Sequence, residues 1–119
     1  MEIRKIAEIL DAQVLCGKDL LDRSVKSAFG CDMMSDVLAY VKDQSVLITG
    51  LCNPQVVRTA EMMDMRCIVF VRGKIPPQSV IDLAEEAGIV VMATKDIMYV
   101  TCGKLYEVGL VGGDVMRNG

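Results

Sequence analysis

Polar residues and glycines follow three short apolar runs of this chain, at positions where a ligand could be held. Thr49-Gly50 comes directly after Val46-Leu47-Ile48, and the next residues, Asn53-Pro54, are typical of a helix start. A helix N-terminus offers free N–H groups and the positive end of its dipole to an anion. We therefore expect a crevice for a small anion or nucleotide at the strand ends. Its candidate lining residues are Thr49, Gly50, Asn53, Gly73, Lys74 and Thr94.

Two arginines are candidates for facing the anion in that crevice. Arg23 follows two leucines and an aspartate, which suggests partial burial, and a buried guanidinium requires a carboxylate or a ligand anion. The simpler alternative is a solvated turn that contains Asp22 and Arg23. Arg58 stands early in a helix, where a cation opposes the helix dipole. We expect Arg58 to pair with Glu61 or Asp64, or to face a bound anion.

The sequence lacks the residue patterns of common enzymes and metal sites. It contains no histidine, no G-x-x-x-x-G-K-[ST] loop and no G-x-G-x-x-G loop. Its five cysteines form no C-x-x-C pair, so we interpret them as small buried side chains and not as zinc ligands. A small enzyme such as a transferase remains an alternative only through Cys52, because a thiol beside a helix N-terminus can have a lowered pKa. We predict no catalytic site, no metal and no cofactor.

Three consecutive strand–helix units must position the candidate residues. The predicted strands cover 46–49, 67–71 and 89–93, and the helices begin at Pro54, at Pro76-Pro77 and after a capping Asp96. Consecutive units of this kind predict an α/β fold with a mainly parallel sheet in a two-layer or three-layer domain.

Residues 1–44 are less regular than the rest. The pattern predicts a helix over 2–10, strands over 13–16 and 24–30, and a helix capped by Asp32 or Ser35. The expected buried face of that helix consists of Met34, Val37, Leu38 and Val41. No linker separates this part from the strand–helix units, so we predict a single domain over 1–119.

The composition narrows the class of protein. The chain is 52% hydrophobic, yet it has no apolar run of the ~18 to 20 residues that span a bilayer. Its N-terminus mixes acids and bases, unlike a signal peptide, so we expect a cytoplasmic protein without a membrane partner. The net charge of −3 and the aromatic content of 4% argue against nucleic acid as a partner.

Several motifs, in their order along the chain, are similar to those of the DRTGG domain. They are LDRSV, DMMSDVLAY, ITGLCNPQVVRTAEM, IVFVRGKIPPQSVIDLAEEAGI and TCGKLYEVGL. Asp22-Arg23 matches the first part of the family name and Thr49-Gly50 the later part, while Leu51 replaces the usual second glycine. The resemblance implies a domain core over about 20–110, with 111–119 as a peripheral tail.

The resemblance implies a regulatory role. DRTGG domains accompany CBS modules in nucleotide-regulated pyrophosphatases, and they resemble the N-terminal domain of HPr kinase/phosphorylase. As a stand-alone member, this chain is expected to form a homodimer that docks on or regulates a metabolic or kinase-like enzyme. Our leading hypothesis is therefore a non-catalytic regulatory module. The alternative is a small-ligand sensor that binds a nucleotide or phosphorylated metabolite at the carboxyl ends of the strands.

Overall fold

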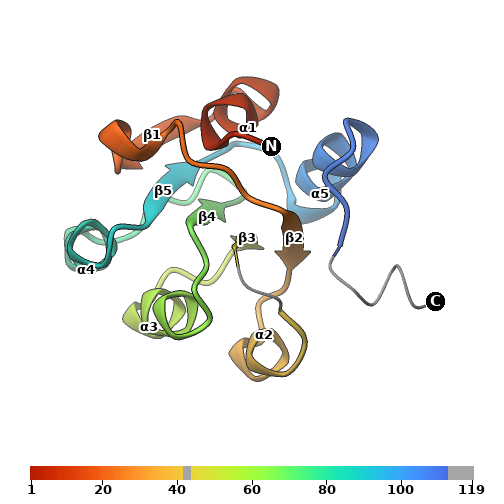
Figure 1. Cartoon of the computed structure of the whole chain (residues 1–119). Coiled ribbons are helices and arrows are strands. Elements are labelled where there is room, and N and C mark those ends of the chain that lie inside the picture. The colour runs from red at the N-terminus through yellow and green to blue at the C-terminus, as the bar shows by residue number, and fades with distance from the viewer. Residues whose placement is uncertain (42–43, 113–119) are drawn as a thin grey trace.

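The protein folds around a five-stranded sheet that has helices on both faces (Figure 1). The computed structural model describes residues 1–41 and 44–112. The elements are α1 Ile3–Leu10, β1 Gln13–Cys16, the 3-10 turn η1 Lys18–Leu20, β2 Ser27–Gly30, α2 Met34–Tyr40, β3 Ser45–Thr49, α3 Pro54–Met62, β4 Cys67–Phe70, α4 Gln78–Ala87, β5 Val90–Ala93 and α5 Met98–Glu107.

The sheet is mainly parallel, as the repeated strand–helix units predict. Its strand order is β1-β5-β4-β3-β2, in which β2 to β5 run parallel and β1 pairs antiparallel with β5. Because each helix from α2 to α4 connects neighbouring parallel strands, the carboxyl ends of β2 to β5 all lie at one edge. We call this edge the strand-end edge.

The domain has three layers, because both faces of the sheet are covered. Alternate residues of β3 show this: Leu47 packs with the core under α2, α3 and α4, while Val46 and Ile48 pack with the core under α1 and α5. Figure 1 shows these two groups of helices on opposite sides of the strands. Burial on both faces explains why the strands read as nearly continuous apolar runs.

The N-terminal segment belongs to this packed unit. Ile3, Ile6 and Leu10 of α1 are buried beneath the sheet, and β1 forms one of its edges. The packed part therefore begins earlier than residue 20, where the family resemblance places the start of the core. The expected tail lies mostly outside the described residues.

Several helix ends agree with the sequence signals, and others do not. Asn53 accepts a hydrogen bond from the Val56 N–H and caps α3, and Gly88 ends α4 with a φ of 71°. The predicted caps at Asp32 or Ser35 and at Asp96 are wrong, since α2 and α5 begin without a side-chain cap.

The predicted buried face of α2 is wrong at one position. Val37 and Val41 are buried, but Leu38 is 43% exposed. The helix spans only 7 residues, so it presents a single narrow stripe to the sheet.

Among the described residues, no helix has the length and apolar character needed to cross a membrane.

Candidate functional site

Asp32 connects two of the loops at the strand-end edge. Its Oδ1 accepts hydrogen bonds from the Gly50 N–H at 2.8 Å and from the Thr49 hydroxyl at 2.9 Å. The Leu51 N–H in turn donates to the Thr49 oxygen at 3.1 Å. The carboxylate therefore occupies a position where an external anion would meet the same donors.

Positive charge surrounds this carboxylate. The Gly50 N–H contributes most to holding the pKa of Asp32 below its usual value, and Thr49, Arg72 and Lys74 act in the same direction against the effect of partial burial. Asp32 is thus ionised at neutral pH, and its charge offsets part of the positive potential at this edge.

Arg72 covers the glycine at the end of β3. Its backbone is left-handed, with a φ of 63°, and its N–H donates to the Asp96 carbonyl at 2.8 Å. A Cβ placed on Gly50 would lie 2.5 Å from Nη2 of Arg72. A side chain at position 50 would therefore require the guanidinium, the far end of an exposed side chain, to move.

Cys52 lies in the same loop, and burial there disfavours its thiolate form. Lys74 and Arg72 favour its thiolate, but burial outweighs them and raises the pKa of Cys52 above its usual value. The enzyme alternative rests on a lowered pKa at this residue, and burial acts in the opposite direction.

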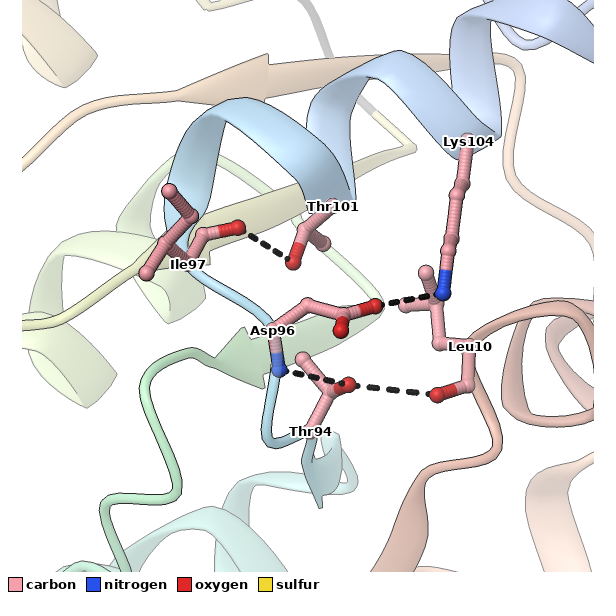
Figure 2. Close-up of polar contacts among 6 residues, drawn as sticks. All are labelled: Leu10, Thr94, Asp96, Ile97, Thr101 and Lys104. Atoms are coloured by element: carbon pink, nitrogen blue, oxygen red, sulfur yellow. Dashed lines mark hydrogen bonds and ion pairs between the residues drawn. The ribbon is translucent and has the colours of Figure 1, made fainter.

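Thr94 is buried at the end of β5, where its hydroxyl joins the sheet to α1 (Figure 2). The hydroxyl donates to the Leu10 carbonyl at 3.1 Å and accepts from the Asp96 N–H at 3.4 Å. Together with Gly73 and Lys95, Thr94 also lines a cavity of about 200 Å³. Only part of Thr94 is therefore accessible to a ligand.

Two of the predicted site residues lie away from the strand-end edge. The Arg23 guanidinium donates to the Gly88 carbonyl at 2.8 Å, at the amino end of β5, while Asp22 pairs with Arg4. Arg58 is exposed on α3 and lines a groove of about 370 Å³ between α3 and α4. Neither arginine faces the expected crevice.

The remaining six predicted residues divide into two groups along the edge. Thr49, Gly50 and Asn53 belong to the loop after β3, where the Asn53 side chain caps α3. Gly73, Lys74 and Thr94 follow β4 and β5, and the Gly73 N–H donates to the Thr94 carbonyl at 2.8 Å.

The sequence did not lead us to predict that Asp32 lies at the strand-end edge. Its position two residues after the end of the predicted strand 24–30 is the signal that could have identified it. In a parallel sheet, that position lies beside the end of the next strand, here Thr49-Gly50.

A second surface feature lies on α5, the helix beside α1. Tyr99 and Tyr106 are 85% and 52% exposed, and Cys102 and Gly103 lie between them. With Glu107 these residues line a shallow, mainly apolar groove of about 380 Å³. We call Tyr99, Cys102, Gly103 and Tyr106 the tyrosine row.

Comparisons with known proteins agree with this architecture. A solved structure of the CBS and DRTGG domains of the regulatory region of Clostridium perfringens pyrophosphatase, complexed with its activator diadenosine tetraphosphate, is similar with a TM-score of 0.71 and 13% sequence identity. The match covers 96% of this chain and 49% of that one, so this chain spans about half of its length. No curated protein matches. The family model of the DRTGG domain matches residues 5–108, and the chain therefore belongs to the DRTGG domain family.

Proposed function

We propose that this chain is a non-catalytic regulatory module that acts as a homodimer and docks on a metabolic or kinase-like enzyme. Membership of the DRTGG family supports a regulatory role, because the similar structure is part of the regulatory region of a pyrophosphatase. That neighbour shows the shared fold, and the proposal for this chain rests on its own surface.

The exposed tyrosine row on α5 carries the proposal. Large aromatic side chains that line an apolar groove on a surface helix are typical of protein–protein contacts, since their burial stabilises a complex. The strand-end edge favours the same role. Asp32, Thr49 and Asn53 each accept a hydrogen bond from a backbone N–H, which leaves them poorly placed for acid–base work.

The alternative function is a sensor for a nucleotide or phosphorylated metabolite at the strand-end edge. The specific observation in its favour is the positive charge of Arg72 and Lys74 around Asp32. A phosphate could replace the Asp32 carboxylate on the Gly50 N–H, because both are anionic acceptors. In this mechanism, ligand binding would release the loop after β2 and so change the surface near α2.

We further propose that the protein acts in the cytoplasm. The five cysteines are all free thiols, and Cys16 and Cys67 are buried. Free thiols are typical of a reducing compartment.

Sedimentation velocity of the full chain at micromolar concentrations tests the leading proposal. We expect a species of twice the subunit mass of 13.0 kDa. A monomer at every concentration would contradict the homodimer. Pull-down with an enzyme encoded nearby, compared with an unrelated enzyme of similar charge, tests the docking.

Thermal shift with adenine nucleotides, including a dinucleoside polyphosphate, and with inorganic phosphate tests the alternative. A ligand at 100 times its dissociation constant stabilises the folded state by about 2.7 kcal/mol. Lys74→Ala should abolish such a shift, and Lys18→Ala, an exposed lysine on η1, should preserve it. The absence of any shift favours the pure interaction module.

A further inference from the structure

The tyrosine row has the same order of large and small side chains in both directions along α5. It reads Tyr-x-x-Cys-Gly-x-x-Tyr, with the spacing i, i+3, i+4, i+7 that places four residues on one helical face. Large side chains stand at both ends of the row and small ones in the middle. A helix face with this symmetry matches a second copy of itself in the antiparallel direction.

We infer that α5 helices of two copies pair antiparallel, about a two-fold axis that passes between Cys102 and Gly103. This inference rests on the proposed homodimer and names its interface. A two-fold contact requires that if residue i meets residue j, then j also meets i. Under this register Tyr99 meets Tyr106 of the second copy, and Cys102 meets Gly103 of the second copy.

The small residues at the centre permit close approach of the helices. A Cβ on Gly103 would have no atom within 4 Å, so the groove at this point is open toward solvent. In this register each tyrosine ring would lie against a tyrosine ring of the second copy, and the small central residues leave room for helix axes about 8 Å apart, the lower end of the usual range. The apolar lining of that groove would then be covered by the rings of the second copy.

Charge complementarity selects the antiparallel direction. The first turn of α5 contains no acidic residue, and no side chain caps its N-terminus. Glu107 is exposed at the other end of the helix and lines the same groove. In the antiparallel register, Glu107 of the second copy lies beside Met98, where the free N–H groups and the positive dipole end favour a carboxylate. Parallel pairing would instead bring the two Glu107 carboxylates together.

Contacts between α5 and the rest of the protein hold the tyrosine row in a fixed orientation (Figure 2). Thr101 is buried and donates to the Ile97 carbonyl at 2.9 Å, and Lys104 pairs with Asp96 at 2.6 Å. Leu105 is buried in the core beneath the helix. The row is therefore preorganised, which lowers the entropic cost of association.

Gly103→Cys provides a direct test of the register. Residue 103 lies next to the proposed axis and faces Cys102 of the second copy, so a mild oxidant such as diamide should link two copies through a disulfide between residue 103 and Cys102 of the second copy, as the two thiols lose two electrons to the oxidant. We expect this variant to fold, because a Cβ at position 103 would have no atom within 4 Å. Met62→Cys, at an exposed position on α3, is the matched control and should remain unlinked.

Substitution of the tyrosines provides the second test. Tyr99→Glu and Tyr106→Glu should each weaken dimerisation by more than about tenfold, with an unchanged circular dichroism spectrum. Tyr40→Glu is the matched control, because Tyr40 is 58% exposed on α2 and lies outside the row. A wild-type dimer that survives both tyrosine substitutions, or that fails to link through residue 103, would overturn the α5 interface and leave the homodimer in place. A wild-type monomer would overturn both.

Discussion

The backbone N–H of Gly50 donates a hydrogen bond of 2.8 Å to Oδ1 of Asp32, and this contact joins the loops that follow β2 and β3. The two residues are 18 positions apart in the chain and meet because their strands are parallel neighbours. A carboxylate of the protein itself thus occupies the donors that a bound anion would use.

Asp32→Asn should lower stability at neutral pH by about 1 kcal/mol, because a charged acceptor becomes neutral and the site is partly exposed. The folded-state pKa of Asp32 lies below its usual value, so the stabilisation is complete above pH ~4 and disappears as the pH falls through the folded-state pKa. Urea unfolding of both proteins at several pH values should show the difference shrinking toward acid pH. Asp19→Asn, at an exposed position on η1, is the control for the loss of one negative charge.

Gly50→Ala should destabilise the wild type more than it destabilises an Arg72→Ala variant. The new Cβ collides with the Arg72 guanidinium, and the collision disappears when that side chain is truncated. We expect a coupling free energy of at least about 0.5 kcal/mol in a double-mutant cycle measured by urea unfolding. Additive effects would show that the guanidinium does not rest on Gly50.

Thr94→Val should cost about 1 to 3 kcal/mol, because the buried Leu10 carbonyl loses its hydrogen bond from the Thr94 hydroxyl while the shape is nearly preserved. Thr94→Ser keeps the hydroxyl and should lose clearly less. Chemical unfolding of the three proteins measures this difference. A larger loss in Thr94→Ser than in Thr94→Val would point to the methyl group and not to the hydrogen bond.

Cys52 should react with iodoacetamide more slowly than free cysteine near pH 8. Burial raises the pKa of this thiol, and the thiolate is the reactive form. Peptide mapping by mass spectrometry follows the residue individually. In denaturant its rate should rise to that of free cysteine, and a folded-state rate above free cysteine would revive the enzyme alternative.

The sequence was sufficient for the architecture because the relevant signals are local. Continuous apolar runs identify β3, β4 and β5, and the signals at Asn53-Pro54 and Gly88 mark helix ends. Consecutive strand–helix units then leave few topologies besides a mainly parallel sheet.

Side-chain partners were harder to predict, because they come from distant parts of the chain. Asp32 has the local pattern of a helix cap, yet in the folded protein it accepts hydrogen bonds from the Gly50 N–H and the Thr49 hydroxyl. Arg23 likewise donates to a carbonyl 65 residues away. Local preferences cannot anticipate such partners, since each partner depends on strand order and register.

The sequence by itself determined the fold class, the family and the stretch around Thr49-Gly50 as part of a strand-end edge. Only the tertiary structure decided that Asp32 and Arg72 both lie against Gly50. It also decided that Arg23 and Arg58 lie away from the strand-end edge and that the tyrosine row of α5 faces outward. The physical reason is that periodicity along a chain fixes which face of an element is buried. Contacts between elements follow from how the layers pack against one another.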